Sequence, residues 1–373
     1  LAGGCSDGGA FGGGIYANAA LTVRDSLVEG NELVSDDEGG ALWGGGIAKV
    51  GAGPFLIEGS TIRGNRGRSA AGLWSQTEAT MIVDTVIEEN EAEELAGGAI
   101  FQGPVRVERS SIRGNLSGLD VGGAYIAVER SQGFPDPSPF EFVDATVSGN
   151  NAVRAGGGLA FVVANGAQAR LSFANSTLSG NEAAEGGRDL HVEGVGDDAL
   201  THEPSLSFAA LTNATLSGSG EPRERAIFVG GRLGGTGLVE AVNTVVDGAC
   251  TASAGGGIAS LGHNVARGVS CGFTGAGDRQ GVDPKLGPLA ANGGPTLTHA
   301  LLAGSPAIDG GDPAFCPVAD QRGEARADGR CDVGAYEYKK PTLCGGAQGP
   351  VAASGPLLAC AAVLVLIAAR RRR

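Results

Sequence analysis

A seven-residue phrase recurs along the first two thirds of the chain and restricts the folds that the chain can adopt. Six copies end in asparagine, and successive asparagines are 34, 25, 25, 35 and 31 residues apart: Asn31, Asn65, Asn90, Asn115, Asn150 and Asn181. Two decayed copies follow at 213–219 and 243–248. A repeat of about 20–40 residues built on short β-like runs is typical of a solenoid of stacked coils.

Three columns of the aligned copies predict the inside of these coils. The second residue of the phrase is small, the fourth is aliphatic, and the residue two before the phrase is mostly apolar. Alternation with period two places all three columns on one inward face of a strand. The aliphatic column is Val28, Ile62, Ile87, Ile112, Val147, Leu178, Leu216 and Val246. An antiparallel sandwich is the alternative, but it gives no reason for the same letters to recur in every copy.

The glycine and asparagine that close the phrase have a backbone explanation. Both tolerate the left-handed conformation, so the pair suits a tight turn between two strands of one coil. Asparagine amides stacked from coil to coil can also hydrogen-bond to one another. We therefore interpret the six asparagines as a turn ladder, and binding of a ligand by them is the less favoured alternative.

Composition supports strands and excludes one class of partner. Glycine supplies 67 of 373 residues, which opposes helix by ~1 kcal/mol at each position. All 41 acidic residues lie before residue 339, together with 21 of the 27 lysines and arginines, so residues 1–338 carry a net charge of -20. Such a body repels phosphates, and we expect no nucleic-acid partner.

The repeat texture resembles the right-handed parallel β-helix shared by pectate lyases and many surface proteins. The resemblance covers residues 8–272, or about eight coils, and it implies an all-β fold without implying an activity. Residues 1–7 are interpreted as the remnant of a longer exported precursor, because the chain starts without Met or a signal peptide.

The segment 273–338 carries a more specific resemblance. It contains Val282-Asp-Pro-Lys-Leu-Gly-Pro-Leu, Gly293-Gly-Pro-Thr-Leu-Thr-His, Gly304-Ser-Pro-Ala-Ile-Asp and Cys331-Asp-Val-Gly-Ala-Tyr-Glu. This is similar to the terminal region of the bacterial surface proteins called choice-of-anchor Q. The resemblance implies export and surface display with no family-wide enzymatic activity. A solenoid also needs a cap on its open end, and we expect this segment to cover the last coil.

Four of the seven cysteines bracket short loops. Cys316 and Cys331 enclose a loop rich in Pro, Asp, Arg and Gly, and Cys250 and Cys271 enclose a glycine-rich one. No C-x-x-C pair exists, so a zinc ribbon or a thioredoxin-like motif is not expected. We predict two disulfides, which imply an oxidising compartment.

The C-terminal tail predicts membrane attachment. A linker at 339–356 holds Cys344, Gly345 and Gly346, and the segment 357–373 is apolar until it ends in Arg370, Arg371, Arg372 and Arg373. Arginines after an apolar stretch fix the cytoplasmic side of a membrane. The order of a cysteine, a spacer of small residues, an apolar stretch and an arginine cluster is similar to that in the C-terminal sorting tails of myxobacterial surface proteins. This resemblance implies a sorting protease that acts near Cys344. A plain, unprocessed membrane anchor is the alternative.

Catalytic motifs are not found. The pectin hydrolases of this fold carry Gly-His-Gly, which does not occur here, and the four histidines stand alone in the sequence. Gly268-Val-Ser-Cys-Gly272 fits G-x-S-x-G, but about one such match is expected by chance in so glycine-rich a chain, and no helix is predicted nearby. We predict no catalytic, cofactor-binding or metal-binding residue. Acidic residues after the turns could bind Ca²⁺ weakly, although a solvated edge is the favoured interpretation.

Two longer insertions are the best candidates for a binding surface. The loops 132–139 and 194–204 both fall between a glycine-led strand and the strand that enters the phrase. They are predicted to project from the same corner, two coils apart, and to contact a glycan or a surface protein. The sequence thus predicts an exported, cell-surface β-helix with a structural or adhesive role. A carbohydrate-active lyase or hydrolase is the alternative.

Overall fold

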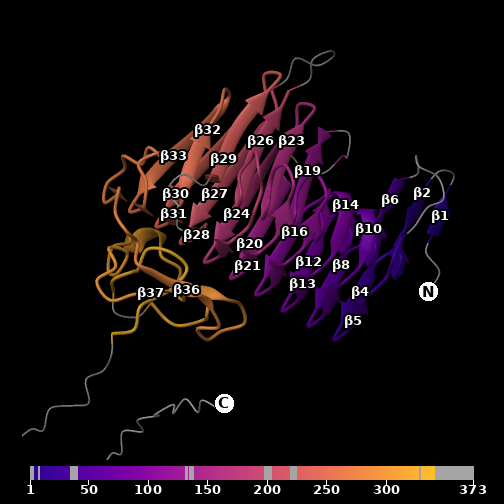
Figure 1. Ribbon diagram of the computed structural model, residues 1–373, viewed down its shortest axis with the longest axis horizontal. Coiled ribbons are helices and arrows are strands. Elements are labelled where there is room, and N and C mark those ends of the chain that lie inside the picture. The colour runs from indigo at the N-terminus through magenta and orange to yellow at the C-terminus, as the bar shows by residue number, and fades with distance from the viewer. Residues whose placement is uncertain are drawn as a thin grey trace, which may run out of the picture. The chain divides into compact units, whose positions relative to one another are not determined.

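The chain folds into a parallel β-helix (Figure 1). The computed structural model describes residues 4–6, 9–33, 41–130, 133, 138–196, 204–218, 225–326 and 329–340. Within these residues helix is confined to the 3₁₀ turn η2 (Pro313–Phe315) and the 3₁₀ residue Arg130, and residues 1–338 form one compact unit. The all-β, parallel architecture predicted from the repeat is confirmed.

Four sheets form the sides of the coils, and all their pairings are parallel except β1 with β2. Sheet A contains β1 (Gly4–Ser6), β2 (Gly9–Phe11), β6 (Ala41–Trp43), β10 (Arg66–Ser69), β14 (Glu91–Leu95), β18 (Leu116–Ser117) and β22 (Asn151–Ala152). Sheet B contains β3 (Ile15–Ala17), β7 (Ile47–Val50), β11 (Leu73–Gln76), β15 (Ala99–Phe101), β19 (Ala124–Glu129), β23 (Leu159–Ala164), β26 (Leu190–Val195), β29 (Arg225–Arg232) and β32 (Ala249–Ala252).

The other two sheets follow along each coil. Sheet C contains β4 (Leu21–Arg24), β8 (Phe55–Glu58), β12 (Thr80–Val83), β16 (Val105–Glu108), β20 (Ser138–Val143), β24 (Gln168–Ala174), β27 (Leu206–Thr212), β30 (Thr236–Val242) and β33 (Gly256–Gly262). Sheet D contains β5 (Leu27–Glu29), β9 (Thr61–Arg63), β13 (Val86–Glu88), β17 (Ser111–Arg113), β21 (Thr146–Ser148), β25 (Thr177–Ser179), β28 (Thr215–Ser217), β31 (Val245–Asp247), β34 (Val265–Ala266) and β35 (Arg279–Gln280).

The first residue of the phrase forms a corner between sheets C and D. It has a left-handed backbone in every copy, for example φ 45° at Asp25 and φ 48° at Asn213. The three predicted columns therefore point inward from two strands joined at this corner, and not from one continuous strand. His263, with φ 57°, occupies the same corner in a further coil that the phrase alone does not reveal.

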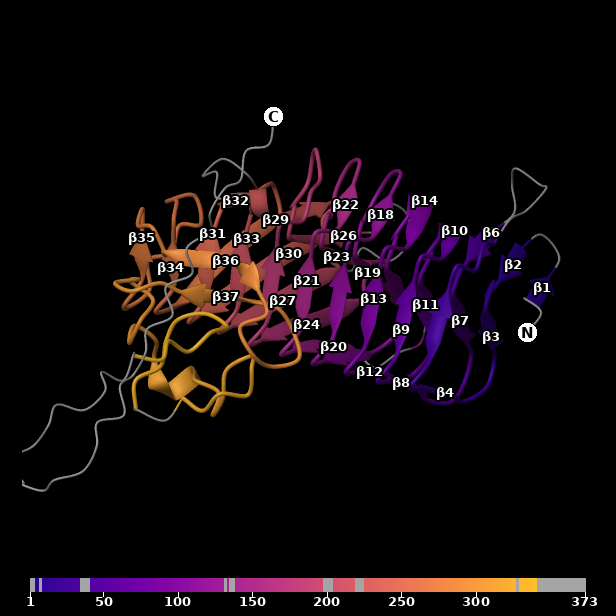
Figure 2. The same ribbon diagram turned by 60° about the horizontal axis from the view of Figure 1, so that its bottom comes forward.

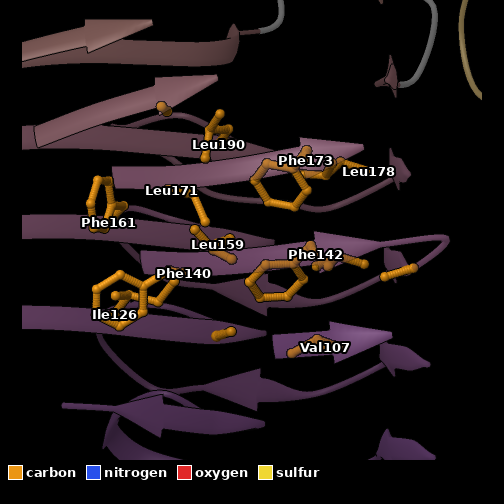
Figure 3. Close-up of a cluster of buried hydrophobic side chains, with 14 of the residues drawn as sticks. Val107, Ile126, Phe140, Phe142, Leu159, Phe161, Leu171, Phe173, Leu178 and Leu190 are labelled. Atoms are coloured by element: carbon orange, nitrogen blue, oxygen red, sulfur yellow. The ribbon is translucent and has the colours of Figure 1, made fainter. Parts of the chain in front are cut away.

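Like residues stack in the core, as the columns predict. Ile62, Ile87 and Ile112 pair in register and are at most 1% exposed. In the middle coils the packing is aromatic, because Phe142 lies 4.9 Å from Phe173 between ring centroids (Figure 3). This continuous apolar interior stabilises each coil only through its neighbours.

The six asparagines form an uninterrupted ladder. Each of the first five donates its side-chain amide to Oδ1 of the next, at 2.8–2.9 Å, and its backbone N–H to the same atom at 3.0–3.1 Å. The last, Asn181, donates to Oδ1 of Asp189 at 2.8 Å. Asn65, Asn90 and Asn150 are fully buried. The asparagines thus satisfy one another inside the fold.

Both predicted disulfides are present, and they lie in different places. Cys250–Cys271 holds the segment 267–281 against the last coil, where Cys271 and Phe273 join the main apolar core. Cys316–Cys331 lies within the segment 283–338, which we call the flanking segment.

The flanking segment lies against the side of the coils, whereas we expected it to cover their end. Its hairpin β36 (Leu286–Ala290) and β37 (Thr298–Leu301) packs beside the later strands of sheet D (Figures 1 and 2). Asn175, Asn213 and Asn243, all first residues of the phrase, donate hydrogen bonds to its carbonyl oxygens at 2.7–3.1 Å. The end of the core is covered by residues 267–281, so only the first part of the predicted cap, 273–281, lies where we expected it.

The outward residues of sheet D explain why the segment docks on the later coils. Position five of the phrase alternates in charge in the first four copies, where Glu29 pairs with Arg63 and Glu88 with Arg113. In the next three copies the same position is serine and position three is threonine, and all six side chains are at most 5% exposed. Uncharged hydroxyls can be buried under a covering segment because they find hydrogen-bond partners there.

The predicted tail lies outside the described residues. This includes Cys344, Gly345, Gly346 and Arg370 to Arg373, so the sorting and anchoring hypotheses stay predictions. None of the helices in the described part of the chain has the length and apolar character needed to span a bilayer.

Candidate ligand-binding groove

A second left-handed corner, between sheets A and B, shapes the outer surface. Its residues are Gly44, Ala70, Ala96, Val121 and Gly156, with φ between 52° and 76°. Outward side chains of sheet B gather beside it in a small apolar cluster that is separate from the main core and includes Trp74, Ile100 and Ala160. Each of these alternates along its strand with a core residue. We call this corner and the flanking outer surfaces of sheets A and B the groove.

The N-terminal end of the groove is aromatic. The ring of Trp74 lies 5.3 Å from that of Phe11 and 5.2 Å from that of Trp43, and Tyr16 lies 6.2 Å from Phe11. The indole N–H of Trp74 donates to Oε1 of Gln102 at 2.8 Å, which fixes the plane of the ring. Tyr16 is 38% exposed, so this end presents an aromatic surface to solvent.

The C-terminal end of the groove holds a polar pocket of about 440 Å³. It is lined by Leu95, Asp120, Val121, Tyr125, Arg154, Ala155, Ala160, Val162, Glu185, His191, Glu193 and Arg232. These residues come from successive coils, because the parallel register brings Tyr125, Ala160 and His191 into one outward row. We call this cavity the pocket.

The centre of the pocket is an ion pair between Glu193 and Arg232. Nε of Arg232 lies 2.7 Å from Oε1 of the carboxylate, and Nη2 lies 2.8 Å from Oε2. Burial pushes the pKa of Glu193 upward, but His191 and Arg232 outweigh burial, so the pKa lies below its usual value. The glutamate is therefore ionised at neutral pH. Its side chain is 11% exposed, whereas that of Arg232 is 66% exposed and reaches solvent.

His191 is held in place by packing. Its ring stacks on Phe228 with centroids 4.7 Å apart, and its Nε2 lies 3.8 Å from Oε2 of Glu193. Its Nδ1 is buried with no hydrogen-bond partner among the described residues. A side chain at Gly186 would come within 2.8 Å of that nitrogen, so only glycine leaves room for the ring.

The rim and floor of the pocket are also constrained. Asp120 and Arg154 pair through two N–H groups of the guanidinium, with Nε 3.1 Å from Oδ1. Burial, reinforced by nearby carboxylates, raises the pKa of Tyr125 to about 12, so its hydroxyl stays protonated. Val121 has φ 60°, a conformation that costs a β-branched residue about 1–3 kcal/mol and is concentrated at functional sites.

The predicted site residues lie elsewhere. The six asparagines of the ladder are part of the interior, and the four cysteines form the two disulfides. The loops 132–139 and 194–204 do connect sheet B to sheet C two coils apart, but most of their residues lie outside the described ones.

The acidic residues after the turns do not assemble a metal site in the described part of the chain. Glu91 and Glu94 instead pair with Arg66 and Arg68 at 3.0 and 2.8 Å. These four residues line a hollow of about 720 Å³ on sheet A. The acidic residues at 36–38 lie outside the described residues, so weak calcium binding stays a prediction.

Sequence reasoning missed the pocket, although a signal was present. The residue that follows the first strand residue after each glycine turn points outward, and this column reads Tyr16, Ala48, Trp74, Ile100, Tyr125, Ala160, His191 and Phe228. Four of the eight are Phe, Trp or Tyr, in a chain in which these types make up 5% of the residues, and a fifth is the ring of His191. Aligning the glycine-led strands, and not only the phrase, would have revealed this row.

Comparisons with known proteins give a likeness in structure but none in sequence. Neither the protein-family models nor the curated proteins include a match to this chain. Among solved structures, the chain is similar to the pectate lyase Pel9A, with 12% sequence identity over 88% of this chain and 87% of that one, and a TM-score of 0.38.

Proposed function

We propose that the protein is an exported β-helix that binds carbohydrate along the groove. The observation that carries the proposal is the outward aromatic row, which starts at Tyr16 and Trp74 and runs into a pocket with fixed charged pairs. Sugar rings present C–H faces and hydroxyl edges to a protein. Aromatic side chains offer large apolar surfaces to the former, and charged groups form strong hydrogen bonds with the latter.

Fixed geometry favours recognition of a rigid ligand. Arg232 and Arg154 are each held by a carboxylate, so few rotamers are lost when a ligand binds. The stacked rings of His191 and Phe228 are likewise held in place. A groove that is ordered before binding loses less entropy than mobile loops would, which is why we place the ligand here and not on the loops 132–139 and 194–204.

A glycan array and calorimetry on the full chain test this proposal. The variants Trp43→Ala and Arg232→Ala should each weaken binding at least tenfold, because they remove the two kinds of contact. Phe315→Ala is the matched control, since Phe315 is 43% exposed on the flanking segment, away from the groove. Binding that survives both groove variants unchanged would refute this location.

A carbohydrate-active enzyme is the second candidate, favoured by the ionisable groups Tyr125, His191 and Glu193 in one pocket. Glycoside hydrolysis needs one protonated and one ionised carboxyl group. Here Glu193 has a lowered pKa, so it is not suited to act as the acid. Chromatography of array-positive oligosaccharides after incubation with the protein distinguishes the two, because turnover would establish the enzyme.

Surface display completes the proposal. The two disulfides support an oxidising, extracytoplasmic address. The resemblance of the segment 273–338 to choice-of-anchor Q proteins, and of the tail to myxobacterial sorting signals, supports attachment through residues 344–373. In this proposal a sorting protease and the membrane are partners of the tail, and the groove faces the environment.

A further inference from the structure

We infer that the pocket selects an uncharged sugar and rejects uronic-acid chains. The inference rests on the proposed function, since it names the class of carbohydrate that the same groove takes. It departs from what the likeness to a pectate lyase would suggest, and it is carried by the charges that line the pocket.

The local charge of the pocket is negative. Two arginines, Arg154 and Arg232, face three carboxylates, Asp120, Glu185 and Glu193, which leaves one net negative charge. Both Asp120 and Glu193 are more buried than the arginines that they hold, with exposed fractions of 23% and 11% against 52% and 66%. A carboxylate on a ligand would have to approach arginines whose charge is already compensated.

The charges around the pocket also disfavour an anionic ligand. Residues 1–338 carry a net charge of -20, so the field of the body repels a polyanion before contact. Glu129 extends the same strand as Tyr125, and it raises the pKa of that hydroxyl together with Glu193. None of the described residues that line the pocket is a lysine that could compensate this charge.

The same groups suit neutral hydroxyls. The Glu193–Arg232 pair uses Nε and one N–H of Nη2, which leaves the Nη1 edge of the guanidinium as a donor. The carboxylate oxygens retain lone pairs as acceptors, and the protonated hydroxyl of Tyr125 can donate or accept. A pair of adjacent hydroxyls on a sugar is matched by a donor and an acceptor that lie side by side, and such a pair requires no net charge on the ligand.

Calorimetric titration of the full chain tests the inference. The probes are hexasaccharides of xylan, mannan and cellulose, with oligogalacturonate of the same length as the charged probe. We expect at least one neutral hexasaccharide to bind at least tenfold more tightly than oligogalacturonate, and raising the salt concentration from 50 to 500 mM should change its affinity less than twofold.

Charge variants identify the cause. Asp120→Asn and Glu193→Gln should each raise the affinity for oligogalacturonate at low salt, and Glu193→Gln should weaken the neutral ligand at least tenfold. Glu88→Gln on sheet D is the matched control for net charge and should change neither affinity. Tighter binding of oligogalacturonate by the unaltered protein overturns this inference while leaving the proposed function intact. Binding of no probe, neutral or charged, counts against both.

Discussion

Thr177 and Gln321 are 144 residues apart in the chain, and the hydroxyl of Thr177 donates a hydrogen bond to Oε1 of Gln321 at 2.6 Å. The amide nitrogen of Gln321 reaches Thr146 Oγ1 and Thr296 Oγ1, both at 2.9 Å, and the side chain is 1% exposed. One glutamine thereby joins two coils to the flanking segment.

The first prediction concerns this contact. Gln321→Leu should lower the free energy of unfolding by about 2–4 kcal/mol, because it leaves the hydroxyls of Thr146 and Thr177 buried without this partner. Urea denaturation measures the loss, and limited proteolysis should show faster cleavage within 283–338. Val318→Ala is the control in the same segment, since Val318 is 90% exposed, and it should have no effect. Equal stability of the two variants would contradict the docking described above.

The second prediction concerns the inner column. Ile87→Asp or Ile112→Asp should prevent folding, because an unpaired carboxylate in the core costs several kcal/mol against a total stability of ~5–15 kcal/mol. Leu27→Asp on the same sheet should be tolerated, since Leu27 is 55% exposed. Circular dichroism spectra and melting curves of the three variants provide the measurement. An unchanged melting temperature for Ile112→Asp would show that the column is not inward.

The third prediction concerns the ladder. Asn115→Ala removes an interior member that both donates and accepts, and it should cost about 2–3 kcal/mol. Asn31→Ala removes the first member, whose Oδ1 accepts no bond from another member of the ladder, and it should cost less than about 1.5 kcal/mol. Chemical denaturation of both variants tests the difference, and an equal loss would argue against a directional ladder.

The fourth prediction concerns pH. Burial raises the pKa of Asp144 from 3.8 to about 6, helped by Glu108 and Asp320 and opposed by Asn175 and Arg109. The folded state therefore holds its proton more tightly than the unfolded state does. The stabilisation that comes from protonated Asp144 is complete below about pH 4 and is lost as the pH rises through about 6.

Asp144→Asn removes this titration. We expect the difference in unfolding free energy between Asp144→Asn and the unaltered protein to shift in favour of the variant as the pH rises from 4 to 7. Urea midpoints at pH 4, 5, 6 and 7 measure it. Asp84→Asn is the control at the same phrase position, where Arg109 forms an ion pair with the carboxylate. A difference that does not vary with pH would show that Asp144 does not titrate in this range.

The fifth prediction concerns the tail. Deletion of 344–373 should release folded protein into the medium, because the core columns of the described residues all lie within the compact unit 1–338. Cys344→Ala should stall a processed protein in the inner membrane with its arginines retained. If the tail is a plain anchor, the substitution should change neither size nor location. Intact-mass measurement decides between them, and a mature surface form that ends at Arg373 would exclude processing.

The sequence was informative wherever stacking demands identical residues. The column that contains Ile87 and the ladder that contains Asn90 could be predicted because each copy of the phrase has the same neighbours above and below. The two disulfides followed from close spacing. The left-handed corner at Asp84 was not predicted, because its side chain points to solvent and varies freely between Asp, Arg, Gly and Asn.

The pocket could not be predicted by the same reasoning. Glu193 and Arg232 occur once each in their columns, so repetition gives no signal for them, whereas His191 belongs to the outward row that alignment of the glycine-led strands reveals. The docking of the flanking segment did not follow from the inward columns, because the informative change lies at the outward position five, where charged residues are replaced by Ser148, Ser179 and Ser217.

The change from charged residues to hydroxyls on sheet D also separates coils whose number can change from coils whose number is fixed. Among the described residues, the hydrogen bonds between the flanking segment and the coils begin at Asp144, so a lineage could gain or lose one of the first four coils without disturbing that contact. The number of later coils is constrained by the flanking segment. Coils are stacked about 4.8 Å apart, and Asn175, Asn213 and Asn243 must each meet a carbonyl group of that segment. Homologues should therefore vary in the number of early coils and keep the number of late ones.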